Sequence, residues 1–502
     1  MVESFTHQFD SSFYKGSVTL NTGLFVGGKW IQPIDKDTLD VVNPSTGKLL
    51  TRVSAASPAD VDIAVKVARE TFKKSWGLKV PGFERGNLLN RLAALVEEHA
   101  DQFAALEALN TGKHFVHAKA FDMGISINTL RYYAGWADKN NGQTLEASTT
   151  ESKFAYTRHE PIGVCALVVP WNFPLMQAIC KIAPALATGN TIIVKPSEFT
   201  PLTILRFADL VTEAGFPAGT VNILPGIGSV AGQALIDHPD IGKISFTGST
   251  LVGRKIMEGS AKSNLKRVTL ELGGKSPAII FDDAVLDKAI PWVTTGVFHQ
   301  SGQICMAGSR IFVQEGIYDQ FMSRFTAAVK AINIGDAFDP NSHQGPVVSE
   351  AHMKRVLGYI ESGKTAGATV VTGGSRIGET GFFIQPTIFT DVKLDMKIVR
   401  EEIFGPVCAV VKFKEEQEVI DLANDTVYGL TASIFTENIS RGLRVAHGLE
   451  TGQAYINSSI NAAVQVPFGG VKQSGFGKEL GQYALEAYTN VKAVHVNIDP
   501  VL

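Results

Sequence analysis

The spacing of hydrophobic positions changes twice along this chain of 502 residues. Short strand-like runs within residues 23–53 give way to apolar residues at helical spacing from about residue 58 to about Gly135. From Pro161 to Gly274, short β-branched runs alternate with helical patterns, and a second alternating series runs from Ser276 to about residue 457. Because such alternation is typical of strand–helix–strand units, the pattern predicts two α/β domains with parallel sheets.

Local signals indicate where several elements begin and end. Ser57 precedes the first helical stretch in the manner of a helix cap, and Gly189 and Gly215 follow two later ones. Within residues 484–498, apolar and polar positions alternate, which predicts an edge strand. An unpaired strand edge promotes aggregation, so we expect this strand to pair with another segment, such as one from a second subunit.

Composition excludes several classes of protein. Hydrophobic residues make up 45% of the chain and charged residues 19%, a balance typical of globular proteins. A net charge of −3 without a long Lys/Arg block argues against a nucleic-acid partner, which requires a concentrated basic surface. The most apolar segment, from Gly163 to Val194, is interrupted by prolines and by Lys181, so no membrane span is expected.

The cysteines and the two ends of the chain bear on its cellular compartment. Four scattered cysteines are too few for a disulfide framework or a zinc site, so no metal is expected and a reducing compartment is indicated. The N-terminal segment has neither the apolar core of a signal peptide nor an Arg-rich amphipathic stretch, and the C-terminal segment matches no retention signal. We therefore expect a cytoplasmic protein. The cysteines are Cys165, Cys180, Cys305 and Cys408.

Two glycine turns compete as the binding site of a dinucleotide pyrophosphate. GIGSVAG, at residues 226–232, follows a strand and fits the loose pattern G-x-G-x-x-[GA], which is a weak signal alone. FTGST places Gly248 and Ser249 between a strand and a helix, where backbone N–H groups and the helix dipole favour a phosphate. KPSE, from Lys195 to Glu198, ends another strand with a cation and a carboxylate, which could hold a ribose or form a surface ion pair. Composition does not choose between the two turns.

Three residues are candidate catalytic groups. Asn172 lies at a strand end in PWNF and offers an amide donor. Glu271 lies in an apolar strand pattern, where burial raises the pKa of a carboxyl group and suits it to act as a general base. Cys305 follows a glycine-containing turn, where backbone amides favour a thiolate. Taken singly, such residues are more often a turn asparagine, a surface glutamate and a core cysteine.

Seven motifs occur in one order over about 300 residues: PWNFP, KPSE, FTGST, ELGGKSP, GQICMAGSR, EEIFGP and PFGGVKQSGFGKELG. From about Leu24 to about Val496, this series resembles the aldehyde dehydrogenase superfamily, and its broad-specificity hydrolytic members in particular. The resemblance implies a Rossmann-like NAD-binding domain at residues 1–141 and 160–273, an α/β catalytic domain at 274–482, and a small β oligomerisation arm at 142–159 and 483–502. It also implies a homodimer or homotetramer.

The resemblance assigns roles to the two glycine turns. Gly248 and Ser249 would contact the pyrophosphate with Trp171 nearby, and the loop that contains Gly228 would lie near the adenine. The complete set of cofactor-binding residues that the resemblance implies is Val169, Trp171, Lys195, Glu198, Gly228, Gly248, Ser249, Val252, Gly253, Glu402 and Phe404.

The two riboses of the cofactor have separate partners in this family. Lys195 and Glu198 match the pair that binds the adenosine ribose. Because a carboxylate accepts from a 2′-hydroxyl but repels a 2′-phosphate, NAD is expected to be preferred over NADP. Glu402 and Phe404 match the residues that hold the nicotinamide ribose and flank the ring.

The resemblance also implies a mechanism. The Cys305 thiolate attacks the aldehyde, the Asn172 amide and the Cys305 N–H stabilise the oxyanion, and hydride transfer leaves a thioester. Glu271 then activates the water that hydrolyses it, so the product is a free acid and not a coenzyme A ester. Lys181 and Glu479 match positions proposed to relay protons.

The chain departs from the family pattern beside the nucleophile, where a common Phe-Asn pair is replaced by His299 and Gln300. Gln300 supplies the same amide with one more methylene, and His299 adds a titratable group to the substrate tunnel. Cys180 stands where many relatives have an aromatic residue, which favours a wide tunnel and a medium-size or aromatic aldehyde. The implied tunnel residues are Phe173, Met176, Gln177, Cys180, His299, Ile304, Met306 and Phe468.

Three other functions are less compatible with the sequence. A betaine-aldehyde type of substrate is disfavoured because few aromatic residues beyond Phe173 and Phe468 are expected in the tunnel. A specialised semialdehyde dehydrogenase would need a cation in the tunnel, and no Arg or Lys falls at an assigned position. A non-catalytic, crystallin-like derivative would be expected to lack Cys305 or Glu271, and both are present.

Overall fold

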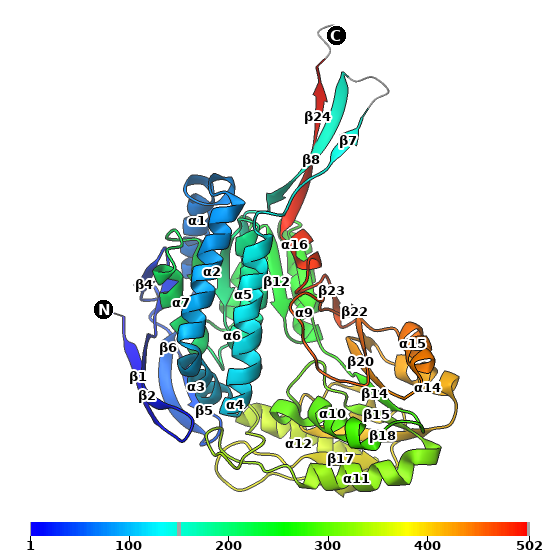
Figure 1. Cartoon of the computed structure of the whole chain (residues 1–502). Helices are drawn as coiled ribbons and strands as arrows, with labels where there is room; N and C mark the ends of the chain where they lie inside the picture. Colours follow the sequence, from blue (N-terminus) through cyan, green and yellow to red (C-terminus); the bar gives the residue numbers. More distant parts are fainter. Residues whose placement is uncertain (1, 148–151, 499–502) are drawn as a thin grey trace.

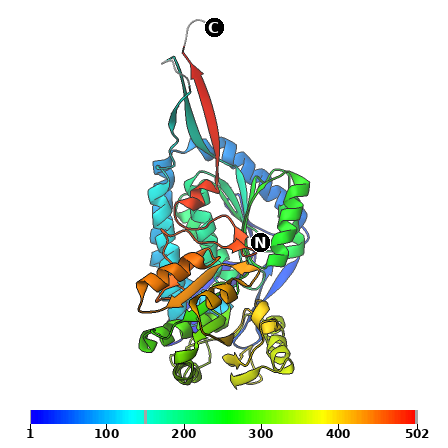
Figure 2. The same cartoon turned by 90° about the vertical axis from the view of Figure 1, so that its right-hand side faces the viewer.

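The computed structural model of the chain describes residues 2–147 and 152–498. These residues form two sheet-based domains and a narrow arm that projects away from both (Figures 1 and 2). The predicted α/β fold is confirmed, because parallel strands flanked by helices form the core of each domain. No helix in the described ranges combines the length and the apolar character that a bilayer crossing requires.

Five parallel strands form the centre of the first sheet, in the order β13-β12-β9-β10-β11. The runs in β9, β10 and β12 are buried almost throughout because helices cover both faces. The chain order reverses at β9, which creates a crevice at the carboxyl ends of the strands. The eight strands are β23 (Gly475–Phe476), β13 (Arg267–Glu271), β12 (Lys243–Thr247), β9 (Val164–Val168), β10 (Thr191–Lys195), β11 (Val221–Ile223), β3 (Leu24–Val26) and β4 (Lys29–Ile31).

The helices of the first domain begin and end at the predicted signals. α1 begins after Ser57, whose side chain accepts from the N–H of Asp60 in a capping box. α6 and α7 are followed by Gly189 and Gly215, whose φ angles of 93° and 88° are left-handed. α6 is buried along its whole length, including Lys181. The helices are α1 (Pro58–Lys74), α2 (Gly82–Glu98), α3 (Ala100–Thr111), α4 (Phe115–His117), α5 (Gly124–Trp136), α6 (Pro174–Ala187), α7 (Leu202–Glu213), α8 (Gln233–Asp237) and α9 (Thr250–Ser263).

The second sheet has seven strands, all parallel to their neighbours except β16 beside β17. Helices α10 and α11 pack on this sheet through a shared apolar core. The strands, in spatial order, are β16 (Thr369–Thr372), β17 (Thr387–Thr390), β18 (Val407–Phe413), β15 (Arg310–Gln314), β14 (Pro277–Ile280), β20 (Thr431–Phe435) and β21 (Gln453–Ile456). The helices are α10 (Leu286–Phe298), α11 (Tyr318–Lys330), α12 (Glu350–Thr365), α13 (Lys397–Arg400), α14 (Glu416–Asn424) and α15 (Ile439–Gly448).

The arm is a three-stranded antiparallel sheet in the order β24-β8-β7. The strand expected near the end of the chain therefore forms, and it pairs with β8 along its length. In the part of the chain that the structure describes, the other edge of β24 faces no strand. The strands are β7 (Thr144–Glu146), β8 (Lys153–Pro161) and β24 (Thr489–Asn497), and α16 (Tyr483–Glu486) precedes the last of them.

Between the second domain and the arm, the chain returns to the first sheet. β23 pairs antiparallel with β13, and the Ser474 hydroxyl donates to the Gly273 carbonyl over 2.7 Å. The pairing places the segment around residues 475–480 beside the strand end that carries Glu271. Two hairpins pair β1 (Ser4–Asp10) with β2 (Lys15–Asn21) and β5 (Thr38–Asn43) with β6 (Lys48–Ser54). A further two-stranded antiparallel sheet joins β19 (Tyr428–Gly429) to β22 (Val471–Lys472), which is distant in sequence.

Candidate active site

A cavity of about 500 Å³ lies at the carboxyl ends of β9, β10, β12 and β13. We call it the cofactor cavity, after the residues predicted to bind a cofactor. The loops that leave these strands carry the motifs PWNF, KPSE, FTGST and ELGG, so motifs far apart in the sequence meet at one edge of the sheet. Ten predicted cofactor residues line this cavity: Val169, Trp171, Lys195, Glu198, Gly228, Gly248, Ser249, Val252, Glu402 and Phe404.

Gly253 is the predicted cofactor residue that does not line the cavity. It lies one turn into α9, where a Cβ atom would come within 2.8 Å of the Leu272 side chain. Gly253 therefore allows α9 to pack closely against Leu272, which does line the cavity. The structure shows this packing role, and contact between Gly253 and the cofactor stays a prediction.

The turn at Gly248 presents the start of α9 to the cavity. A Cβ atom at Gly248 would lie 2.4 Å from the Phe246 ring, so no side chain fits there. Ser249 caps the helix, and its hydroxyl accepts from the Val252 N–H over 3.3 Å. Free N–H groups and the positive end of a helix dipole favour an anion, which suits a pyrophosphate. The competing Gly228 loop also lines the cavity, beside Ser229 and Gly232.

Charged residues lie at two places along the cavity. The Lys195 ammonium is 3.7 Å from the Glu198 carboxylate, and burial lowers the lysine pKa. Elsewhere, Glu402 accepts from the Gly274 N–H over 3.0 Å, and burial raises its pKa to about 7. A Cβ atom at Gly273 would come within 2.4 Å of the Glu402 carboxylate, so this packing needs glycine.

Two of the lining residues that the sequence does not predict lie on α12, a segment without a recognised motif. His352 and Arg355 lie on α12 and donate toward the carbonyls of Phe404 and Glu402, over 2.7 and 3.1 Å. Both hydrogen bonds fix the backbone of the EEIFGP segment, which carries Glu402 and Phe404. Trp171 and Phe404 also meet edge to face, with ring centroids 5.2 Å apart.

Cys305 lies where the cofactor cavity meets a second, narrower cavity, and it lines both. The turn before it has three successive residues with left-handed φ angles: 52° at Gln300, 57° at Ser301 and 68° at Gly302. Such angles cost of order 1 kcal/mol or more at a non-glycine residue, so the surroundings must hold the turn. They do so through the Gln303 side chain, which donates to the Gln300 carbonyl over 2.9 Å, and through Ser301, which donates to Gly345.

The Cys305 thiol has a raised pKa, contrary to the expectation that the turn favours a thiolate. Burial raises it first, and the charges of Glu271 and Glu402 add to that effect. The hydrogen bond from its own backbone acts in the opposite direction but is outweighed. The carboxylates come from segments distant in sequence, so the motif around Cys305 gave no sign of them.

Asn172 is held close to Cys305 by the same turn. Its amide nitrogen donates to the Gln303 carbonyl over 2.9 Å, which leaves its second N–H for another acceptor. The Gln300 side-chain amide donates to the Asn172 carbonyl. Gln300 therefore links the turn before Cys305 to the loop that carries Asn172.

Glu271 ends β13 as a buried carboxyl group. Neither of its carboxylate oxygens has a hydrogen-bond partner among the described residues. Its pKa is raised well above the usual range, first by burial and then by the charge of Glu479, as expected of a general base in an apolar setting. Its carboxylate packs against Gly469, where a Cβ atom would come within 2.5 Å, and Glu271 lines neither cavity directly.

Lys181 and Glu479 form a buried ion pair beside Glu271. The Lys181 ammonium also donates to the Thr247 hydroxyl over 2.6 Å. Glu479 lines the narrower cavity, so this pair connects its wall to the end of β12. The two residues predicted from the resemblance to relay protons are thus in direct contact.

The narrower cavity, of about 50 Å³, extends from Cys305 on the side away from the cofactor cavity. We call it the tunnel. All eight predicted tunnel residues line it: Phe173, Met176, Gln177, Cys180, His299, Ile304, Met306 and Phe468. Its wall also contains residues that the sequence did not suggest, namely Phe121, Ile125, Ile460, Ala462, Glu479 and Leu480.

Phe121 corrects one sequence-based expectation. Few aromatic residues beyond Phe173 and Phe468 were expected, but Phe121 adds a third ring, 6.0 Å from that of Phe173. It belongs to a π-helical turn at Ala118–Met123, between α4 and α5. No motif marks this segment, and only tertiary packing brings it to the tunnel.

Comparison with known proteins is consistent across sequence and structure. Residues 30–494 match the family model described as "Aldehyde dehydrogenase family". The chain is similar to an aldehyde dehydrogenase of Agaricus bisporus (55% identity, covering 99% of each chain) and to one of Emericella nidulans (52% identity, covering 96% of each chain). It is also similar to the NAD⁺ complex of an aldehyde dehydrogenase from Bacillus cereus (46% identity, TM-score 0.94, covering 95% of this chain and 97% of the other).

Proposed function

This chain belongs to the aldehyde dehydrogenase family, and we propose that it oxidises medium-size or aromatic aldehydes to free carboxylic acids with NAD. The observation that carries the proposal is the position of Cys305, which lines both the cofactor cavity and the tunnel. A nucleophile at that junction can meet an aldehyde from one side and a nicotinamide cofactor from the other.

Cys305 acts first as the nucleophile. Its thiol must lose a proton before attack, and the raised pKa means that this proton has to be removed as the reaction begins. The free N–H of Asn172 and the backbone N–H of Cys305 then donate to the oxyanion of the thiohemiacetal. One such donor typically contributes about 3–4 kcal/mol to transition-state stabilisation.

The cofactor site suits a dinucleotide. The turn at Gly248 and the start of α9 suit a pyrophosphate, and the Lys195–Glu198 pair suits the adenosine ribose. Glu402 and Phe404 suit the nicotinamide end of the cofactor. A bound nicotinamide would supply the hydride acceptor that conversion of the thiohemiacetal on Cys305 into a thioester requires. Because Glu198 would repel a 2′-phosphate, NAD is the preferred form.

Glu271 completes the cycle by activating water for hydrolysis of the thioester. Its unpartnered carboxylate and raised pKa suit it to take a proton near neutral pH. Because Glu271 lies just outside the two cavities, its side chain must turn toward Cys305 to reach that water. The Lys181–Glu479 pair then carries the proton toward the tunnel wall.

The competing semialdehyde function receives little support. A substrate carboxylate needs a cation, and the described residues of the tunnel wall include no Lys or Arg. The lysine behind Phe173, Lys113, is already paired with Asp122.

The test is to measure reduced nicotinamide by absorbance with acetaldehyde, benzaldehyde, phenylacetaldehyde and succinic semialdehyde, using NAD and then NADP. We expect turnover with NAD and a preference for the aromatic aldehydes. A clear preference for acetaldehyde would contradict a wide tunnel, and absence of turnover with every aldehyde would contradict the function. Glu271→Gln should retain the first burst of reduced nicotinamide while steady turnover falls by at least about 100-fold.

A further inference from the structure

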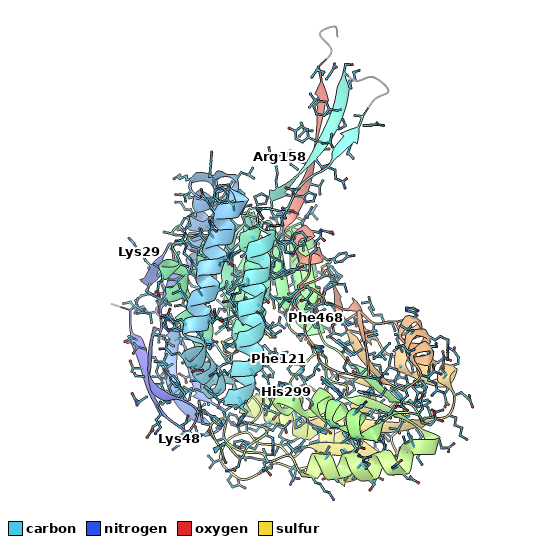
Figure 3. The ribbon with its side chains drawn as sticks, viewed as in Figure 1. Lys29, Lys48, Phe121, Arg158, His299 and Phe468 are labelled. Atoms are coloured by element: carbon cyan, nitrogen blue, oxygen red, sulfur yellow. The ribbon has the colours of Figure 1, made fainter. Side chains whose placement is uncertain are left out.

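The tunnel wall is apolar apart from a few side chains. Phe121, Phe173 and Phe468 supply aromatic surface, and Figure 3 shows Phe121 and His299 close together where the helices of the first domain face the second. A purely apolar aldehyde would need no hydrogen-bonding group in such a wall. The polar side chains in this wall therefore indicate which polar group the substrate carries in addition to its aldehyde.

Three of those polar side chains lie at the reaction centre. Cys305 is the nucleophile, and Glu479 is paired with Lys181. Gln177 lines both cavities and so lies at their junction, close to Cys305. His299 is different, because it lines the tunnel but not the cofactor cavity.

His299 is held by rings and not by hydrogen bonds. Its ring lies edge to face with His117, with centroids 4.6 Å apart and planes at 84°, and 6.2 Å from the Phe121 ring. Its side chain is partly exposed within the tunnel, and none of the hydrogen bonds found among the described residues involves its ring nitrogens. An imidazole has a donor and an acceptor, and leaving both unpaired costs free energy unless a ligand or water meets them.

The surroundings keep this imidazole uncharged. Burial lowers the pKa of His299 to about 3, and the charges of His117 and Lys113 act in the same direction. Burial also lowers the pKa of His117 to about 4, with His114, Lys113 and His343 adding to the effect. Near neutral pH, His299 thus offers hydrogen bonds to a neutral group and gives a carboxylate no cation.

We propose that His299 selects aldehydes that carry an uncharged hydroxyl group at the end remote from the carbonyl. The hydroxyl donates to one ring nitrogen of His299 or accepts from the other, while the aromatic walls enclose the body of the substrate. This inference rests on the proposed function and adds a substrate class to it.

A matched pair of substrates tests the proposal: 4-(hydroxymethyl)benzaldehyde and 4-ethylbenzaldehyde, which differ by one hydroxyl in place of a methyl group. One hydrogen bond to a neutral group predicts that kcat/KM of the wild-type enzyme is about five- to tenfold higher for the hydroxyl compound. In His299→Phe the ratio should fall to about one, and His299→Gln should restore part of it because glutamine keeps a donor and an acceptor.

Two controls make the result interpretable. Met306→Leu changes the tunnel wall without touching a hydrogen-bonding group, so the hydroxyl-to-ethyl ratio should stay near that of the wild type even if both rates change. 4-Formylbenzoate places a carboxylate at the same position and should be the poorest of the three substrates.

The outcomes separate this inference from the function it rests on. If benzaldehyde is oxidised but the wild-type ratio is near one, or if 4-formylbenzoate is preferred, the role of His299 is wrong and the oxidation of aldehydes stands. A ratio that survives in His299→Phe also overturns the role. If His299→Phe fails to fold, the wild-type ratio and the His299→Gln ratio still decide the question. If no aldehyde is oxidised, the proposed function fails first.

Discussion

The two cavities that meet at Cys305 are lined by different kinds of structure. The cofactor cavity is formed by strand ends, glycine turns and the start of α9, so backbone atoms and short loops define its shape. The tunnel is formed by side chains from α5, α6, the π-helical turn and the loops around residues 460 and 480. Substitutions in the tunnel alter its shape and polarity without moving a strand. Because of this difference, substitutions in the tunnel can change which aldehyde binds while the cofactor cavity and the reaction stay the same.

The largest effect is expected from removing the residue that the two cavities share. Cys305→Ala should lower turnover by at least about 10⁴-fold because no other group can form the thioester. Affinity for NAD, measured by calorimetry, should change little, because the other residues that line the cofactor cavity stay unchanged. If NAD binding were lost as well, the two cavities could not be treated as separate units.

The next effect concerns Asn172, the proposed oxyanion donor beside that junction. Asn172→Ala should lower kcat by about 10²- to 10³-fold while NAD affinity stays within a few-fold, because its amide stabilises charge that develops only during reaction. Asn424→Ala is the matched control, since Asn424 also donates to a backbone carbonyl, that of Gly448 over 2.8 Å, but lies outside both cavities. Equal losses in the two variants would argue against the oxyanion role.

A smaller effect is expected on the cofactor side alone. Glu198→Gln removes the charge that would repel a 2′-phosphate, so kcat/KM for NADP relative to NAD should rise by about tenfold, an electrostatic energy of about 1.4 kcal/mol. The change should shrink at high salt because Glu198 is partly exposed. Kinetics with both cofactors on benzaldehyde would measure it, and an unchanged ratio would remove Glu198 from cofactor selection.

The pH dependence of turnover separates the two halves of the reaction. The pKa of Glu271 is raised, first by burial and then by Glu479, so the carboxylate form that acts as base increases as pH rises. Steady turnover should therefore rise with pH by several-fold from about pH 6 to about pH 9. The slope should disappear from the residual turnover of Glu271→Gln, and stopped-flow measurement of the burst would report the Cys305 proton separately.

The smallest effect is expected on the tunnel side. Because burial and the neighbouring His117 and Lys113 lower the pKa of His299 to about 3, its imidazole is already neutral at pH 6. The preference for 4-(hydroxymethyl)benzaldehyde over 4-ethylbenzaldehyde should then change by less than about twofold between pH 6 and pH 9. A preference that vanished across this range would mean that a charged His299 is involved.

The contrast between the cavities also explains how much could be predicted from sequence. Strand ends are local features, and parallel strands bring their carboxyl ends together, so residues such as Lys195, Glu198 and Gly248 could be placed at one edge of a sheet. For Gly253 the structure shows packing against Leu272, a role that the motif alone does not distinguish from contact with a ligand.

The tunnel was less predictable for a physical reason. Phe121 and Ile460 lie in segments without motifs and reach the tunnel only through tertiary packing. The raised pKa of Cys305 has the same origin, because Glu402 is nearly a hundred residues away in sequence and Glu271 comes from the end of β13. Burial and charge at a site depend on neighbours that local patterns do not reveal.

The return of the chain to β13 has a consequence for the order of folding. β23 and Glu479 are separated from β13 and Lys181 by roughly 200 and 300 residues, so the ion pair and the strand pairing form only after the second domain has been synthesised. Contacts so distant in sequence are slow to form, and domains fold largely in the order of synthesis. Until residue 479 leaves the ribosome, a nascent first domain has the open edge of β13 and an unpaired, buried lysine. That stage is the one at which a chaperone would have the greatest effect on the yield of active enzyme.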